Sequence, residues 1–172
     1  MKSFFLSLVA VFALAQLAQA DVTVKITKVH LCCGKCVSGA EKALSKVDGV
    51  TANVDSTNKT IAITAPDAAT AQKAVDALTK AGFFGQTENA DIKIDASTGA
   101  AGSKVQSLKV QGVHLCCPKC VTAVHNAVMK VPGVSGENAE KGAESFVVTG
   151  DFNDADVFTA LQKAGLTGKV GN

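Results

Sequence analysis

Three cysteines and one histidine stand within seven residues in the stretch HLCCGKC, residues 30–36, and the arrangement returns as HLCCPKC, residues 114–120. Thiolates act as nucleophiles, as redox partners and as ligands for soft metal ions. All six cysteines of the chain lie in these clusters, so none is left for a disulfide framework across a domain. Each cluster also keeps one spare thiol after any internal pairing. The spacing therefore favours a ligand or redox site over a structural staple.

The elements around the clusters occur twice. At an offset of 84 residues, VHLCCGKCVSGAEKALSKVDGV (29–50) matches VHLCCPKCVTAVHNAVMKVPGV (113–134) at 13 of 22 positions. The segments ALTKAGFFG (77–85) and ALQKAGLTG (160–168) match further along each copy. An internal repeat of this length indicates two small domains. Between them, ASTGAAGSK (96–104) is small and polar, which predicts a flexible linker.

The hydrophobic period changes in the same order within each copy. Alternating apolar residues predict strands around 22–26, 50–54 and 61–63, and helical spacing predicts helices over 37–47 and after Asp67. We expect a last strand around Ile92 and Ile94 in the first copy and over 167–170 in the second. This β-α-β-β-α-β order predicts an α+β chain of two ferredoxin-like domains, each an antiparallel sheet with both helices on one face.

The predicted elements place the cysteines in the loop between the first strand and the first helix. Cys36 and Cys120 then lie in the first helical turn, where free backbone N–H groups and the helix dipole stabilise a thiolate. Cys33 and Cys117, three residues earlier, are able to turn back toward the same point. Two thiolates that converge in an open loop suit a soft ion that must be taken up and released.

The motif in this setting resembles the heavy-metal-associated domain family, which includes copper chaperones, modules of copper-pumping ATPases and a periplasmic mercury-scavenging protein. The resemblance covers both copies and implies metal ligation by the two CxxC pairs, namely Cys33, Cys36, Cys117 and Cys120. Leu31 and Leu115 stand where the family usually has Met. The segment KALSKVDGV (42–50) is most similar to the mercury-scavenging branch. The resemblance also implies a loop that covers the site at AGFF (81–84), with Phe83 as an apolar lid.

The extra cysteines, Cys32 and Cys116, depart from the family pattern. A third sulfur suits Hg(II), Cd(II) or Zn(II), or a small Cu(I) cluster, but adjacent cysteines point in different directions, so ligation and a spectator role are both retained. His30 and His114 are expected to be exposed or capped rather than to bind metal. His125 has no counterpart in the first copy and is expected at the surface. One ion per domain and one ion clamped between the domains remain alternatives.

The first twenty residues have the pattern of a signal peptide: Lys2, an apolar run over 4–15, and a small-residue cleavage site at 18–20. We therefore expect a signal peptide at 1–20, metal-binding domains at 21–95 and 105–172, and the linker at 96–104. No later run reaches the roughly 18 apolar residues of a membrane span, so a periplasmic or secreted location follows. The chain has no Arg, which argues against a nucleic-acid partner.

The leading function is an exported protein that captures Cu(I), Hg(II) or Zn(II) and passes it to a donor or acceptor protein such as a membrane transporter. The first alternative is thiol–disulfide exchange by the CxxC pairs, although both copies lack the Trp that precedes such a motif in thioredoxin-like proteins. A second alternative is an adapter whose spare thiols crosslink to another chain. No triad, paired carboxylates or phosphate loop accompanies the clusters, so no enzymatic activity is expected.

Overall fold

Two βαββαβ units follow one another in the computed structural model, which describes residues 21–172. The predicted signal peptide, residues 1–20, lies outside the described residues. The first unit contains β1 (Val22–Thr27), α1 (Gly34–Leu44), β2 (Thr51–Asp55), β3 (Thr60–Ala65), α2 (Ala68–Lys80) and β4 (Gln86–Thr87). The second contains β5 (Lys104–Gln111), α3 (Pro118–Val128), β6 (Val134–Glu137), β7 (Ser145–Asn153), α4 (Asp154–Lys163) and β8 (Lys169–Val170). The α+β class and ferredoxin-like order predicted from the sequence are confirmed.

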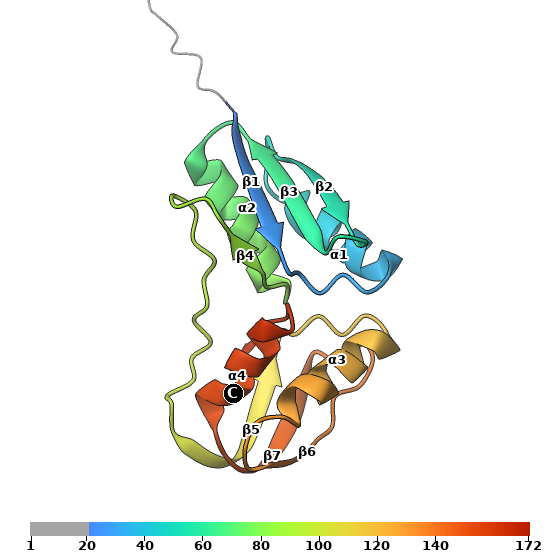
Figure 1. Cartoon of the computed structure of the whole chain (residues 1–172), viewed down its shortest axis with the longest axis vertical. Coiled ribbons are helices and arrows are strands. Elements are labelled where there is room, and N and C mark those ends of the chain that lie inside the picture. Colours follow the sequence, from blue (N-terminus) through green and yellow to red (C-terminus); the bar gives the residue numbers. More distant parts are fainter. Residues whose placement is uncertain (1–20) are drawn as a thin grey trace, which may run out of the picture.

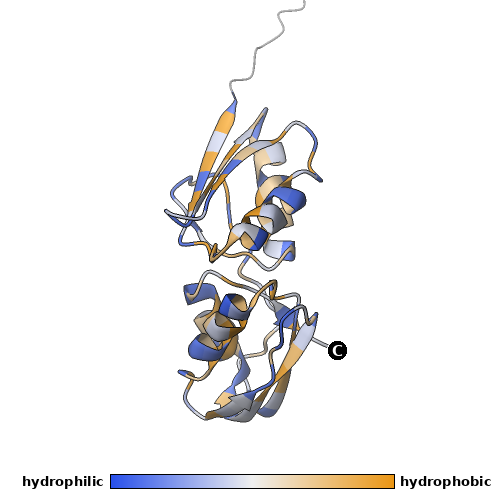
Figure 2. Cartoon of the chain, turned by 90° about the vertical axis from the view of Figure 1, so that its right-hand side faces the viewer, coloured by the Kyte–Doolittle hydropathy of each residue, from blue (hydrophilic) through white to orange (hydrophobic). Residues whose placement is uncertain are grey.

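Each unit is an antiparallel sheet covered by two helices on one face (Figure 1). The strand orders are β2-β3-β1-β4 and β6-β7-β5-β8, so corresponding strands take the same places. In the first sheet Val24 pairs with Ile63 in the register of β1 with β3, and both side chains are completely buried. The apolar residues of the strands alternate with polar ones, as the colours along the sheets in Figure 2 show. The alternation turns one face of each sheet toward its helices.

Polar caps start the second helix of each unit but not the first. Asp67 accepts a hydrogen bond from the Thr70 N–H at the start of α2, and Asn153 accepts one from the Ala155 N–H at the start of α4. The residues at the corresponding position of α1 and α3 are Cys33 and Cys117, whose side chains make no capping hydrogen bond. These two sulfurs consequently remain free to face the end of the helix.

The last strand of the first unit lies earlier than predicted. The sequence indicated a strand at Ile92 and Ile94, but β4 is Gln86–Thr87, which pairs with the end of β1. Ile92 is buried without being part of a strand. Both backbone groups of Lys93 bond to the side-chain amide of Gln72 on α2, at 2.9 and 2.7 Å. The apolar alternation here therefore marks a segment fixed to a helix, which periodicity does not distinguish from a strand.

The segment between the units lies along the second unit (Figure 1). The Asp154 carboxylate, whose residue is only 6 % exposed, accepts hydrogen bonds from the N–H groups of Ala101 and Ser103, each at 2.9 Å. The Val170 N–H donates to the Thr98 carbonyl at 2.8 Å. Nothing in the small, polar composition of residues 96–104 predicts these bonds, because they depend on groups more than fifty residues away. Among residues 21–172, no helix has the length and apolarity that crossing a bilayer requires.

Candidate metal centre

The loops that carry the cysteines face each other across the boundary between the two units. The loop between β1 and α1 ends one unit, and the loop between β5 and α3 ends the other (Figure 1). Cys32 Sγ lies 3.4 Å from Cys117 Sγ, and Cys36 Sγ lies 3.6 Å from Cys116 Sγ and 3.7 Å from Cys120 Sγ. Within one loop, Cys33 Sγ and Cys36 Sγ are 3.9 Å apart. Sulfurs of different domains are therefore as close as sulfurs of one loop.

Two matching loops hold the domains in this arrangement. The Phe84 N–H donates to the Gly165 carbonyl at 3.1 Å and the Thr167 N–H donates to the Gly82 carbonyl at 3.0 Å. Phe83 and Leu166 form an antiparallel bridge between these two bonds. The His30 N–H also donates to the Gly165 carbonyl, at 3.1 Å. The repeated AGFF and AGLT segments thus pair with each other, which brings both cysteine loops to one place.

Glycine is required where these loops meet. Gly82 and Gly165 have φ values of 85° and 77°, in the left-handed region that favours glycine. A Cβ at Gly165 would lie 2.5 Å from the backbone of both Lys28 and His30, in the other domain. A Cβ at Gly82 would lie 2.5 Å from His114 N. Any side chain here forces the two domains apart.

All six cysteines contribute to the shared cluster. Cys36 and Cys120 are completely buried, and the other four are partly exposed. Both adjacent cysteines of a loop reach this site, although we expected them to point in different directions, because the site lies between the domains. The sulfurs of Cys32, Cys33 and Cys117 all lie within 4.8 Å of one another. All six cysteines are free thiols.

The close sulfurs share protons unequally. A hydrogen bond from Cys120 is the main cause that lowers the pKa of Cys36, to about 2, and the same bond raises the pKa of Cys120. Burial raises the pKa of Cys117, but the Cys120 backbone N–H and neighbouring thiols outweigh it and lower the value to about 6. Burial is the main cause that raises the pKa of Cys116 to about 12 and that of Cys32 above its usual range. The centre therefore holds thiolate charge at neutral pH, with protons left for a metal to displace.

The two histidines before the motifs lie beside this cluster. Among the described residues 21–172, the buried side-chain nitrogen or oxygen atoms without a hydrogen-bond partner are the Nε2 atoms of His30 and His114. A ring nitrogen of His30 lies within 4.8 Å of the sulfurs of Cys32 and Cys120. Burial is the main cause that lowers the pKa of His30, so its ring is mostly neutral at neutral pH. The expectation that these histidines are exposed or capped is wrong. Their repetition before both motifs was the feature of the sequence that could have indicated a place beside the cysteines.

Phe83 covers part of the site from the first domain. The side chain is 2 % exposed, and its ring centroid lies 4.4 Å from that of His114 in the second domain, at an angle of 33°. A Cβ at Gly39 of α1 would lie 2.7 Å from the same His114 ring. The lid that the family resemblance implies at Phe83 therefore packs across the domain boundary and against an imidazole.

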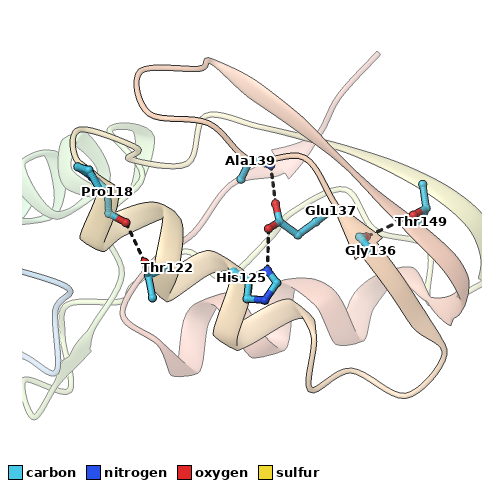
Figure 3. A network of polar contacts seen from close by, with 7 residues as sticks. All are labelled: Pro118, Thr122, His125, Gly136, Glu137, Ala139 and Thr149. Carbon is cyan, nitrogen blue, oxygen red and sulfur yellow. Dashed lines mark hydrogen bonds and ion pairs between the residues drawn. The ribbon is translucent and has the colours of Figure 1, made fainter.

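His125 lies on α3, at the surface of the second domain. Its Nδ1 is 3.0 Å from Glu137 Oε1, while Glu137 Oε2 accepts a hydrogen bond from the Ala139 N–H (Figure 3). The His125 side chain is 55 % exposed, but that of Glu137 is only 6 % exposed. This pair ties α3 to the end of β6 and holds the helix that begins at the second cysteine loop.

Two grooves give access to the cluster. A groove of about 990 Å³ between the domains has His114, Leu115 and Cys116 in its wall. A smaller one of about 220 Å³ reaches His30 and Cys32. The cysteine that departs from the CxxC pattern is thus the one that lines each groove.

The match to a protein-family model agrees with a metal-binding role for this loop. The family model described as heavy-metal-associated domain matches residues 23–84, from β1 to the loop that contains Phe83. A solved structure described as crosstalk between Cu(I) and Zn(II) homeostasis is 25 % identical over 39 % of this chain and 100 % of that chain, with a TM-score of 0.34.

Two further solved structures are of the soluble amino-terminal region of CopA from Bacillus subtilis, a P-type ATPase. They are 17 % and 19 % identical, cover 89 % and 88 % of this chain and 95 % and 92 % of their own, and have TM-scores of 0.34 and 0.32. At these TM-scores the likeness adds nothing to the fold, which the strand orders establish.

Proposed function

Because the heavy-metal-associated domain model matches its first domain, we propose that this chain captures a soft metal ion through its cysteine loops and transfers it to a partner protein. The observation that carries the proposal is the convergence of the six sulfurs, with separations as short as 3.4 Å. Thiolates select Cu(I), Hg(II) and Zn(II) over hard ions such as Mg²⁺, and Cu(I) suits the low coordination numbers that thiols offer here. In this proposal the ion is transported rather than permanently bound. The grooves at Cys32 and Cys116 give the ligands of a partner protein a path to the ion, so that it can be exchanged.

Thiol–disulfide exchange, the alternative, explains less of this site. Such exchange needs a pair of thiols, one attacking and one resolving. It gives no reason for the close approach of Cys36 and Cys120 from different domains, or for a third sulfur in each loop. The lowered pKa of Cys117 suits either function, so only an experiment separates them.

The test is an anaerobic titration of the reduced protein with Cu(I), Hg(II) and Zn(II), followed by thiolate charge-transfer absorbance. The chain has no Trp or Tyr, so this ultraviolet region is clear. Saturable binding that is lost in a Cys33→Ser/Cys36→Ser/Cys117→Ser/Cys120→Ser variant supports capture, and competition between the ions ranks them. No binding, with thiols that instead equilibrate rapidly with a glutathione buffer, overturns the proposal in favour of redox exchange.

Export is a separate part of the proposal. Residues 1–20 are proposed to be removed, so that the mature protein begins at Asp21 and acts in the periplasm or outside the cell. Mass spectrometry of the protein from its native host tests this directly. An N-terminus at Met1 in the cytoplasmic fraction contradicts it.

A further inference from the structure

The six sulfurs have the connectivity of an octahedron. Each sulfur lies within 4.8 Å of at least four of the other five, and the shortest separations run from 3.4 to 3.9 Å. The three pairs outside these contacts take the places of opposite vertices: Cys32 with Cys116, Cys33 with Cys120, and Cys36 with Cys117. The repeat relates Cys32 to Cys116, Cys33 to Cys117 and Cys36 to Cys120. The exchange of the two domains therefore leaves the set of opposite pairs unchanged.

From this arrangement we propose that the two domains share one multinuclear Cu(I) cluster, with a copper ion on each of four alternate triangular faces of the sulfur octahedron. The proposal rests on the proposed function, since it assumes soft-metal capture and specifies how many ions bind and where. It differs from a single ion held by each CxxC pair. The four faces are Cys32–Cys33–Cys117, Cys33–Cys36–Cys116, Cys116–Cys117–Cys120 and Cys32–Cys36–Cys120.

The separations fit three-coordinate ions. With a metal–thiolate bond of about 2.3 Å, three sulfurs around one ion in a plane are about 4.0 Å apart. The face formed by Cys32, Cys36 and Cys120 has edges of 3.5, 3.6 and 3.7 Å, so a small expansion accommodates an ion. Each sulfur belongs to two of the four faces and would bridge two ions. Three of the four faces contain sulfurs from both domains, and the fourth, Cys116–Cys117–Cys120, lies within the second domain.

The connectivity argues against the simpler alternative of two zinc ions. Two tetrahedral Zn(II) ions on six thiolates need two bridging sulfurs, with the four terminal sulfurs separated into two pairs at opposite ends. Cys36 and Cys120 are central enough to bridge. Their partners are not separated, because Cys33 Sγ lies within 4.8 Å of both Cys116 Sγ and Cys117 Sγ. A compact cage of sulfurs favours the soft, low-coordinate Cu(I) ion.

The four Cu(I) ions compensate most of the negative charge of the six thiolates, so the loaded cluster needs no further charged ligand. On loading, the cysteines that are still protonated release their protons to solvent, so that six thiolates meet four Cu(I) ions with four positive charges, and no electron is transferred. The cluster carries a net charge of −2. Hydrogen-bond donors at its edge stabilise such an anion.

The histidines supply a second, independent observation. Buried imidazole nitrogens normally have a hydrogen-bond partner, and the Nε2 atoms of His30 and His114 have none. His30 lies beside Cys32 and Cys120. His114 occupies the corresponding position in the other loop, with its ring 4.4 Å from that of Phe83. One imidazole thus stands at each end of the cage, positioned to donate to the thiolates of a loaded cluster.

The test is an anaerobic Cu(I) titration of the full mature chain against a Cu(I) chelator, with copper per chain measured after desalting and the copper–copper distance measured by X-ray absorption. We expect about four Cu(I) per chain, with a copper–copper scattering path, because all four alternate faces are filled. Two ions per chain without that path overturn the shared cluster and leave the proposed function standing. No binding of any soft metal overturns the proposed function itself.

Single-cysteine variants distinguish a copper cluster shared by the two domains from copper ions that each domain binds independently. Cys36→Ser, in the first domain, removes a vertex common to two faces and is expected to weaken copper–copper scattering and to lower copper by about half. Cys120→Ser, its match in the second domain, is expected to do the same. Loss of only one ion in each variant means that the domains bind independently and contradicts the proposal. Far-ultraviolet circular dichroism that matches the parent protein verifies that both variants are folded.

Discussion

The first domain begins α1 with Gly34 and the second begins α3 with Pro118, although both helices bury a cysteine in the same turn. The supports behind these helices also differ. In the second domain His125 pairs with Glu137, whereas the residues 84 positions earlier in the first domain, Glu41 and Asn53, are both exposed. Beside the metal centre, Gly39 leaves room for the His114 ring, and Ala123 stands at the corresponding place near His30. The two domains therefore hold equivalent cysteine positions by different supports, which predicts where substitutions act alike and where they do not.

The largest effect is expected where the two domains depend on each other. In Gly165→Val the added side chain would meet the backbone of Lys28 and His30 at 2.5 Å, so the domains should separate and the protein lose about 2–4 kcal/mol of stability. Small-angle scattering would show a larger radius of gyration, and copper would fall toward the capacity of separate domains.

Gly142→Val is the matched control for Gly165→Val. Gly142 has a similar φ of 82°, but a Cβ there meets nothing within 4 Å. The Gly142→Val variant therefore introduces similar backbone strain but leaves the boundary between the two domains intact. Equal radii of gyration for the two variants would show that the loop around Gly165 does not set the arrangement of the domains.

Asp154→Ala tests the tie that only the second domain has. Loss of the carboxylate leaves the N–H groups of Ala101 and Ser103 without their partner, and we expect a loss of about 1–3 kcal/mol in urea unfolding. Asp67→Ala removes a single capping bond in the first domain and should cost about 1 kcal/mol. A smaller loss for Asp154→Ala than for Asp67→Ala would contradict the importance of this tie.

The same carboxylate predicts a dependence on pH. Burial raises the pKa of Asp154, but the N–H groups of Ala101 and Ser103 outweigh it, so the net pKa is lowered. A carboxyl whose pKa is lower in the folded state stabilises the protein above its unfolded pKa of about 3.9, and this contribution is lost as the pH falls through the folded value. Stability should therefore fall below about pH 4, and more weakly in Asp154→Asn. Parallel pH curves for the two proteins would refute this.

Glu137→Ala addresses the supports of α3. The buried carboxylate accepts from the Ala139 N–H and contacts His125, so we expect a loss of about 1–2 kcal/mol in thermal unfolding. Asn53→Ala, at an exposed position of β2 in the first domain, should stay within about 0.5 kcal/mol of the parent. Equal effects in the two domains would mean that this ion pair does not support the helix.

The smallest effect is expected where one domain is given the residue of the other. Gly34→Pro should stabilise the protein by about 0.4–1 kcal/mol, because proline restricts the unfolded chain. Cys33 already has the extended backbone, with φ −164° and ψ 171°, that a following proline requires. Pro118→Gly should cost a similar amount. Copper stoichiometry should not change in either variant, and destabilisation by Gly34→Pro would show that the two helix starts are not equivalent.

Local sequence patterns predicted the elements of the fold, with one clear error at the last strand of the first domain. Apolar alternation and helical spacing located β1, α1 and their counterparts, because each element buries one face within its own domain. The same rule misplaced the last strand of the first domain at Ile92, where the apolar residue packs beside a helix. Periodicity reports burial, and burial does not specify the hydrogen-bond partner.

The sequence by itself determined that the chain contains two copies of one thiol-bearing loop at the start of a helix, because spacing along the chain fixes local geometry. Only the tertiary structure decided that the copies face each other. That arrangement depends on the pairing of the loops around Gly82 and Gly165 and on the packing of Phe83 against His114, contacts between residues more than thirty positions apart. It turns adjacent cysteines with divergent side chains into neighbours in one cage, and it buries two imidazole nitrogens that no local pattern marks as buried.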